Sequence, residues 1–199
     1  MAERLVATSH AIHAEPELNF EEHLAHELLT NVLAEEGLPV VRGAYGLDTA
    51  FEADAGTEGP LVAVLCEYDA LPGIGHACGH NVIATAGLGA GLAAATVAAE
   101  LGGRVRILGT PAEEGGGGKV IMASRGAFDG VDAAMMIHPA DADLENITSL
   151  AIQQARVVYE GRAAHAAAAP EKGLNALDAM VLGYGNVAAL RQHIAPDER

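Results

Sequence analysis

The sequence contains no tryptophan, and phenylalanine and tyrosine together are scarce beside its many alanines and glycines. Cysteine is almost as rare. Cys66 and Cys78 are too few for a disulfide framework, and this usage predicts a reducing compartment, the cytoplasm. Basic residues are outnumbered, because 11 lysines and arginines face 27 aspartates and glutamates, for a formal net charge of −16. This charge argues against nucleic acid or an anionic membrane surface as a partner, since phosphate groups would be repelled.

Long hydrophobic runs are also few. The first ten residues lack the apolar segment and cleavage site of a signal peptide, so no leader is predicted. One uncharged stretch, 81–99, approaches the length of a membrane-spanning helix, but small residues dominate it and large apolar side chains are few. We therefore expect a helix packed closely against a sheet, and no membrane partner. Half of all residues are hydrophobic, which predicts a folded chain with a full core.

The order of apolar patterns predicts an α/β fold. Strands are predicted at 61–66, 104–108 and 133–138, with shorter extended segments at 38–41 and 49–52. Helices are predicted at 19–36, at 81–101, and in a short segment ending near residue 125. Strands and helices that alternate in this way are typical of βαβ units, so we predict a mostly parallel sheet covered by helices.

The pattern changes near residue 150, where a second domain is predicted to begin. Residues 149–160 have the β-branched character of a strand, an alanine-rich stretch surrounds His165, and helical periodicity resumes over 175–193. We divide the chain into residues 1–150, forming the larger α/β domain, and residues 151–199, forming the start of a small α+β domain.

Side chains with metal-binding chemistry follow three of the predicted strands. They are Asp69, Cys78 and His80 after the first strand, Glu113 and Glu114 after the second, and His138 after the third. The carboxyl ends of parallel strands lie side by side, so these residues are expected to converge. A thiolate, an imidazole and a carboxylate suit zinc or a similar cation. The adjacent glutamates allow one carboxylate to hold metal while the other acts as general base.

Ordinary structural roles remain open for each of these residues taken singly. A Cys-Gly-His sequence is common by chance, His138 could be a strand-end histidine with satisfied hydrogen bonds, and Cys66 is expected to be a buried strand thiol. The glycine run 115–118 does not make a phosphate-binding loop, because Lys119 is not followed by serine or threonine.

Three segments resemble the M20 metallopeptidases: EYDALPGIGHACGHN at 67–81, TPAEEGGGGK at 110–119 and GRAAH at 161–165. Within that family the sequence is similar to the amidohydrolase branch, which contains aminobenzoyl-glutamate hydrolases and M20 domain-containing dipeptidases. Further similar segments at 12–17, 173–178 and 186–194 extend the resemblance over nearly the whole chain.

The resemblance implies a metal-dependent hydrolase of amide bonds in small N-acyl or aminoacyl amino acids, such as dipeptides or aminobenzoyl-glutamate-like compounds. It implies two divalent metal ions, Zn²⁺ or Mn²⁺, with ligands Cys78, His80, Glu114 and His138. It further implies Glu113 as the general base, Asp69 as the carboxylate that orients a ligand histidine, and His165 as the group that reaches the substrate carbonyl or oxyanion. His165 would lie in a lid or dimerisation domain, 151–199, so a homodimer is expected.

Members of this family are longer and carry a further metal-ligating histidine in a returning segment. The resemblance therefore implies that the chain is a fragment, inactive alone. Two other functions stay open at this point. One is a non-catalytic binding relative, and the other is a thiol hydrolase in which Cys78 is the nucleophile and His80 the base.

Overall fold

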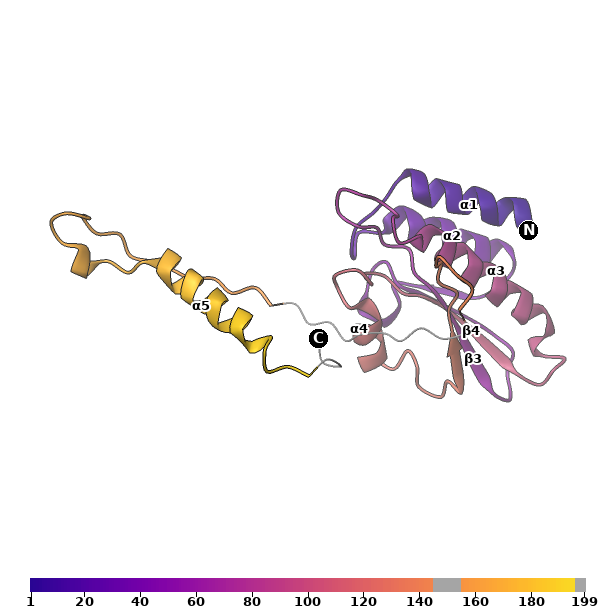
Figure 1. Cartoon of the computed structure of the whole chain (residues 1–199). Helices are drawn as coiled ribbons and strands as arrows, with labels where there is room; N and C mark the ends of the chain where they lie inside the picture. The colour runs from indigo at the N-terminus through magenta and orange to yellow at the C-terminus, as the bar shows by residue number, and fades with distance from the viewer. Residues whose placement is uncertain (145–154, 196–199) are drawn as a thin grey trace. The chain divides into compact units, whose positions relative to one another are not determined.

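The computed structural model describes residues 1–144 and 155–195, and the chain divides into two compact units, Met1–Leu144 and Glu145–Arg199. The first unit carries one five-stranded sheet with helices on it (Figure 1). The functions assigned above to residues 1–150 and 151–199 stay predictions, because compactness alone does not show what a unit does.

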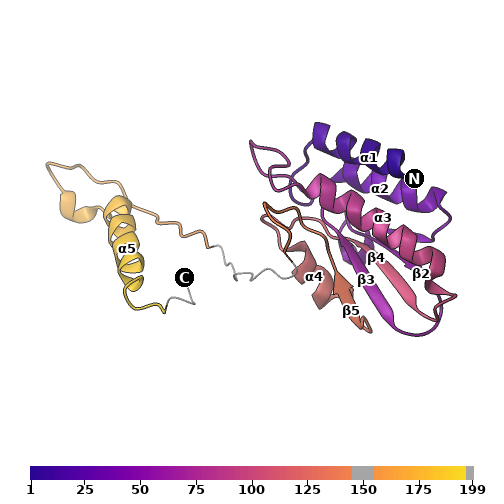
Figure 2. The same ribbon diagram turned by 45° about the vertical axis from the view of Figure 1, so that its right-hand side comes forward.

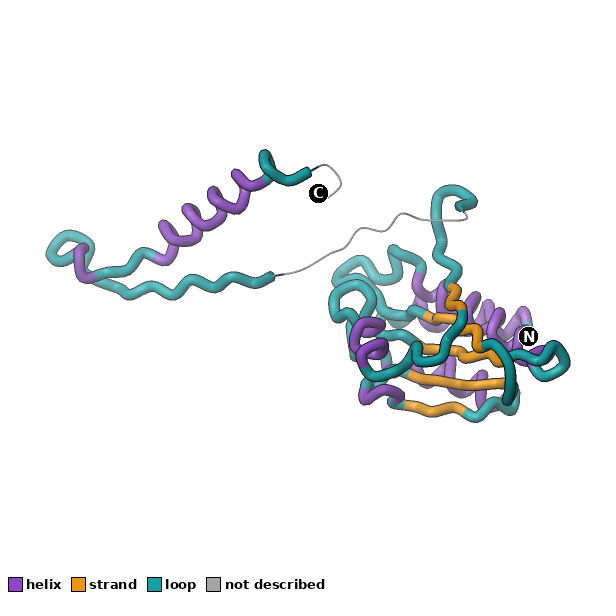
Figure 3. Tube along the Cα trace, turned by 90° about the horizontal axis from the view of Figure 1, so that it is seen from below, coloured by secondary structure: helices purple, strands orange, loops and turns teal. Residues whose placement is uncertain are grey.

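The sheet of the first unit is mixed. It contains β1 (Val40–Arg42), β2 (Phe51–Ala55), β3 (Leu61–Cys66), β4 (Arg104–Gly109) and β5 (Ala133–Met135), in the spatial order β1-β2-β4-β3-β5. The strand β3 is parallel to β4 and β5, whereas β2 is antiparallel to β1 and β4. Figure 3 shows the strands side by side in one layer.

The prediction of a mostly parallel sheet is therefore wrong. Short segments connect β1 to β2 and β2 to β3, and the first includes the 3₁₀ turn Ala44–Gly46. A short connection reverses the chain, because a parallel neighbour needs a crossover of roughly a dozen residues or more. Only β3, β4 and β5 are joined by connections of that length, and these are the three parallel strands on which the predicted convergence of side chains depends.

Three helices cover one face of the sheet and one helix lies against the other (Figures 1 and 2). The first three are α1 (Ala2–Ala14), α2 (His23–Glu35) and α3 (His80–Ala98), and the fourth is α4 (Gly118–Ser124). The helix α1 has no counterpart in the sequence-based prediction. The helix α2 begins at His23 instead of residue 19, because Phe20 adopts a left-handed backbone with a φ of 64°.

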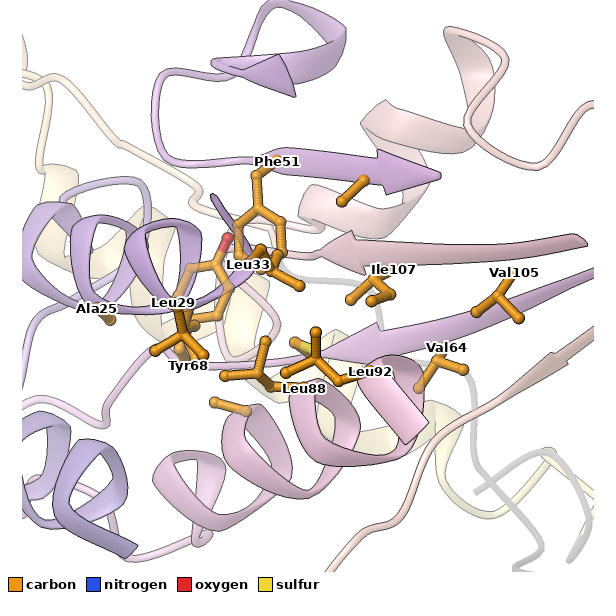
Figure 4. Close-up of a cluster of buried hydrophobic side chains, with 14 of the residues drawn as sticks. Ala25, Leu29, Leu33, Phe51, Val64, Tyr68, Leu88, Leu92, Val105 and Ile107 are labelled. Atoms are coloured by element: carbon orange, nitrogen blue, oxygen red, sulfur yellow. The ribbon is translucent and has the colours of Figure 1, made fainter. Parts of the chain in front are cut away.

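The main core lies between the sheet and the helices α2 and α3 (Figure 4). Leu33 from α2, Phe51 from β2 and Leu88 from α3 are fully buried there. The helix α3 approaches β3 closely at Gly87, where a Cβ atom would lie 2.5 Å from the Leu65 carbonyl oxygen. By length and apolar composition alone α3 could span a membrane, but half of this apolar stretch is buried inside the protein. The predicted packing of this helix on the sheet is confirmed.

The second unit contains α5 (Ala176–Leu190), preceded by the 3₁₀ turn Pro170–Lys172. Asn175 caps α5, since its side-chain oxygen accepts hydrogen bonds from the N–H groups of Leu177 and Asp178. The predicted helix 175–193 is confirmed with slightly shorter bounds. Of the strand predicted at 149–160, residues 149–154 lie outside the described residues, and 155–160 contain no strand.

Candidate metal centre

The candidate centre lies where the parallel strands β3, β4 and β5 end. Asp69 follows β3, and the loop after it leads to His80, the first residue of α3. Glu113 and Glu114 lie between β4 and α4, and His138 follows β5. The convergence expected at the carboxyl edge of a parallel sheet is therefore present in the structure.

His80 lies at the middle of this centre. Its side chain is 1% exposed, and its Nδ1 is 3.0 Å from Asp69 Oδ1. Its Nε2 faces three carboxylates, with Glu67 Oε2 at 3.6 Å, Glu114 Oε1 at 3.7 Å and Glu113 Oε2 at 3.8 Å. A carboxylate that accepts the Nδ1 proton leaves the Nε2 lone pair free for a metal ion, the usual second interaction of a ligand histidine.

Asp69 links the segment after β3 to the segment after β4. While one of its oxygens pairs with His80, Oδ2 accepts the backbone N–H of Glu114 at 2.9 Å. Burial acts to raise the pKa of Asp69, but these hydrogen bonds outweigh it and hold the pKa below its ordinary value. For His80, burial acts to lower the pKa, and the hydrogen bond and charge of Asp69 outweigh it and raise the pKa.

The donor atoms fall into two groups that share His80. One group is Cys78, His80 and Glu114, and the other is Glu67, His80 and His138; within each group the ligand atoms lie within 4.8 Å of one another. Within the described part of the chain, His80 Nε2, Glu67 Oε2 and Glu114 Oε1 are buried without a hydrogen-bond partner. Unpaired buried atoms of this kind are costly, and a divalent cation would satisfy them together.

The Cys78 thiol is held in its protonated form by its surroundings. A hydrogen bond with Glu114, then burial and the charges of Glu114 and Glu113, raise the pKa of Cys78 to about 11. A thiol of this pKa is a poor nucleophile at neutral pH. Cation binding would displace the proton and relieve the repulsion among these acidic groups, so Cys78 fits a ligand better than a nucleophile.

Glu113 is the more accessible of the two adjacent glutamates. Its side chain is 41% exposed, against 18% for Glu114. Burial and then the nearby charge of Glu67 raise the pKa of Glu113, while Lys119 acts to lower it. A carboxylate that is open to solvent on one side and has a raised pKa can exchange protons with a water molecule.

Glu67 is a residue of the centre that the sequence-based interpretation missed. Its side chain is 2% exposed, one oxygen pairs with Lys119, and the other faces His80. The available signal was its position, since Glu67 directly follows the buried strand that ends at Cys66. A charged residue at that point must either be paired or belong to a site.

His138 is exposed but lies beside His80, with the ring centroids 6.1 Å apart and the rings edge to face. Its Nδ1 lies 2.8 Å from the Pro139 carbonyl oxygen, so an Nδ1–H donor there would leave Nε2 free. The structure therefore places His138 where the sequence expects a ligand, although its role stays a prediction.

His165 belongs to the second unit, which is described by itself. Its exposed ring accepts hydrogen bonds at Nδ1 from the backbone N–H groups of Ala167 and Ala168, at 3.3 and 3.2 Å. These contacts orient the ring locally, and the substrate-binding role of His165 stays a prediction.

The comparison with known families decides the membership of this chain. The model of peptidase family M20/M25/M40 matches residues 59–192. The chain belongs to the M20 peptidase family. Xaa-Arg dipeptidase of Mus musculus is 47% identical to it over 212 residues, which cover 100% of this chain and 49% of the relative. The M20 resemblance seen in the sequence is confirmed.

Two further relatives support the similarity to aminobenzoyl-glutamate hydrolases and the assignment of the fold. One of the subunits of the p-aminobenzoyl-glutamate hydrolase from Escherichia coli (strain K12) is 39% identical over 204 residues, covering 92% of this chain and 42% of the relative. The Bacillus subtilis YXEP protein, described as a dinuclear metal binding peptidase, superposes with a TM-score of 0.61 and 29% identity, over 66% of this chain and 41% of that protein. This M20 chain spans about half the length of the curated relatives it matches.

Proposed function

We propose that the protein is a metal-dependent hydrolase that cleaves an amide bond in a small N-acyl or aminoacyl amino acid. The observation that carries the proposal is the buried, unpaired donor set around His80 Nε2 at the ends of three parallel strands. The relatives' names, a dipeptidase and an aminobenzoyl-glutamate hydrolase, support a dipeptide or a related amide as the substrate class.

Divalent metal, zinc or manganese, would be held by Cys78, His80, Glu114 and His138. When bound, it would polarise the substrate carbonyl and make a neighbouring water molecule more acidic. Glu113 takes the proton from the attacking water and returns it to the leaving amine, a role suited to its partial exposure and raised pKa. Asp69 keeps His80 in the tautomer whose Nε2 is free.

The second unit is proposed to supply the lid. His165 would contact the substrate carbonyl or its oxyanion from the partner subunit of a homodimer formed through α5 and the chain around it. The exposed apolar side chains of α5 support such an interface, because contiguous apolar surface is rarely left open to water. A cytoplasmic location is consistent with two cysteines that are both unpaired.

Two observations disfavour a thiol hydrolase. The raised pKa of Cys78 depletes the thiolate, and the side-chain hydrogen bond of the thiol is with Glu114 and not with His80. A non-catalytic binding protein would have no need for a buried set of unpaired ligand atoms, which costs stability without a cation.

Chelation tests the proposal on this chain and on any longer version of it. Treatment with EDTA should abolish amide hydrolysis, and addition of Zn²⁺ or Mn²⁺ should restore it. The variant Glu114→Ala should lose bound metal, as measured by mass spectrometry, while keeping the circular dichroism of the parent. Hydrolysis that survives EDTA but is blocked by iodoacetamide would instead support the thiol mechanism.

A further inference from the structure

A buried carboxylate outside the proposed metal centre holds the loop that carries its glutamates. Glu22 is fully buried at the start of α2. Its Oε1 accepts the backbone N–H groups of Phe20 at 3.0 Å and Ala112 at 2.9 Å, and its Oε2 accepts the Thr49 hydroxyl at 2.7 Å. One side chain therefore links three segments that are far apart in the sequence.

Both backbone N–H groups held by Oε1 belong to residues in an unusual conformation. Phe20 has a φ of 64° and Ala112 a φ of 56°, the left-handed region that residues with a Cβ rarely adopt. Such residues persist only where surrounding contacts hold them, at a cost of about 1 kcal/mol or more each. Glu22 supplies that contact for both.

Ala112 is the residue whose conformation matters for the centre. It directly precedes Glu113 and Glu114, and its carbonyl oxygen accepts the N–H groups of Gly116 and Gly118, both at 3.2 Å. The left-handed turn at Ala112 thus sets the direction in which the two glutamates leave the end of β4. Without its hydrogen bond to Glu22, the backbone could relax and both carboxylates would move.

The other oxygen of Glu22 extends the connection to the end of β3. Thr49 donates its hydroxyl to Glu22, and its carbonyl oxygen accepts the Tyr68 hydroxyl at 2.6 Å. Tyr68 is fully buried, stacks on Phe51 at 6.0 Å between ring centroids, and lies between Glu67 and Asp69 in the sequence. Glu22 therefore contacts the segment after β4 directly and the segment after β3 through Thr49, two of the three strand ends at the centre.

We infer that Glu22 is a positioning residue of the proposed metal centre, which holds the backbone at Ala112 and so fixes where Glu113 and Glu114 point. It touches neither the proposed ligands nor the substrate, and it acts through hydrogen bonds to the backbone and to Thr49. The inference rests on the proposed function, since it assigns Glu22 to the geometry of that same site.

Three variants, made in this chain or in a longer version of it that hydrolyses amides, separate positioning from stability. Glu22→Gln keeps an oxygen for the two N–H groups and offers an amide N–H to Thr49. Glu22→Met has a similar length and no oxygen. Glu17→Met is the matched control, because the Glu17 carboxylate also accepts two N–H groups, those of Leu24 and Ala25, at the start of the same helix but away from Ala112.

The measurements are the dissociation constant for Zn²⁺ by competition with a chelator, kcat at saturating metal, and the urea midpoint of unfolding. We expect Glu22→Met to bind Zn²⁺ about 10- to 100-fold more weakly, the effect typical of residues that support metal ligands, and to lower kcat even when loaded. Glu22→Gln should stay close to the parent. Glu17→Met should lose stability but keep the parent's zinc affinity and kcat.

Parent-like zinc affinity and kcat in Glu22→Met would overturn the inference, as would losses in Glu17→Met equal to those in Glu22→Met. Should Glu22→Met fail to fold, Glu22→Asp keeps the carboxylate but shortens the side chain and withdraws it from the Ala112 N–H, and unchanged zinc affinity and kcat in that variant would overturn the inference as well. A parent chain that binds no Zn²⁺ and hydrolyses amides after chelation would refute the proposed function itself, whatever the variants do.

Discussion

The helices α3 and α5 have similar compositions but different surroundings. Both are rich in alanine, glycine and aliphatic residues. In α3, Leu88 is fully buried in the core against the sheet, whereas α5 buries none of its described residues, and Leu182 is 67% exposed. An apolar stripe shows that a helix needs a partner surface, but it does not show which surface that is.

The histidines assigned to the site in the two units also differ in their burial. In the first unit, His80 is buried among acidic side chains that follow the strands β3 and β4. In the second unit, His165 is exposed and its ring bonds only to nearby backbone in the described structure. The first unit thus contains an assembled candidate site, while the proposed function of the second depends on a surface that would cover α5.

The largest expected effect is a loss of kcat, tested with one variant in each unit. Glu113→Gln should lower kcat by about 10²- to 10⁴-fold, the usual contribution of a general base, and leave the metal content near that of the parent. His165→Ala should also lower kcat without loss of metal, because His165 belongs to the second unit. Steady-state kinetics and metal analysis, on this chain or on a longer version of it that hydrolyses amides, test both variants. Normal turnover in Glu113→Gln would refute the assigned base.

A matched pair of leucines tests the difference in burial. Leu88→Ala in α3 should cost about 2–5 kcal/mol in the free energy of unfolding, because it leaves a cavity in the main core. At protein concentrations where the chain is monomeric, Leu182→Ala in α5 should cost no more than about 0.5 kcal/mol, as expected for an exposed site. Urea titrations give both values. A large loss at Leu182 would break the comparison and show that α5 is covered in solution.

A pair of glycines sharpens the same comparison with a smaller effect. Gly87→Ala in α3 should cost about 1–3 kcal/mol, because the new Cβ would meet the Leu65 carbonyl oxygen and, at 2.8 Å, the Cys66 sulfur. Gly185→Ala in α5 meets nothing within 4 Å and should stabilise the helix by about 0.5–1 kcal/mol. Thermal melts followed by circular dichroism would reveal opposite shifts, and shifts of the same sign would contradict this view of the two helices.

The smallest effect concerns the pH dependence of stability at Glu22, which belongs to the first unit. Burial is the main cause that raises the pKa of Glu22 from 4.5. The pKa of Glu22 is higher in the folded state than in the unfolded state, so proton binding at Glu22 stabilises the fold. This contribution is fully present at a pH below the unfolded pKa and is lost as the pH rises through the folded pKa. Glu22→Gln does not titrate, so its stability relative to the parent should be higher near pH 7 than near pH 5. An equal difference at both values would contradict the direction of the shift.

Much of the first unit could be predicted from local patterns. The apolar run that forms β3 and the small-residue run that forms α3 identify a strand and a helix directly. Successive strand ends with polar residues then predict that His80, Glu114 and His138 approach one another, because parallel strands align their ends. The antiparallel pairing of β2 with β4 was not predictable in this way, since β4 follows β2 only after β3 and α3.

The sequence by itself determined the family and most elements of the first unit, and it predicted a set of metal ligands, because each depends on local periodicity or on a contiguous motif. The tertiary structure alone decided that Glu67 faces His80 and that Glu22 holds Ala112, a residue 90 positions away. The physical reason is that a buried charge is recognisable only by its partners, and those partners are brought together by packing between distant segments, which no local pattern records.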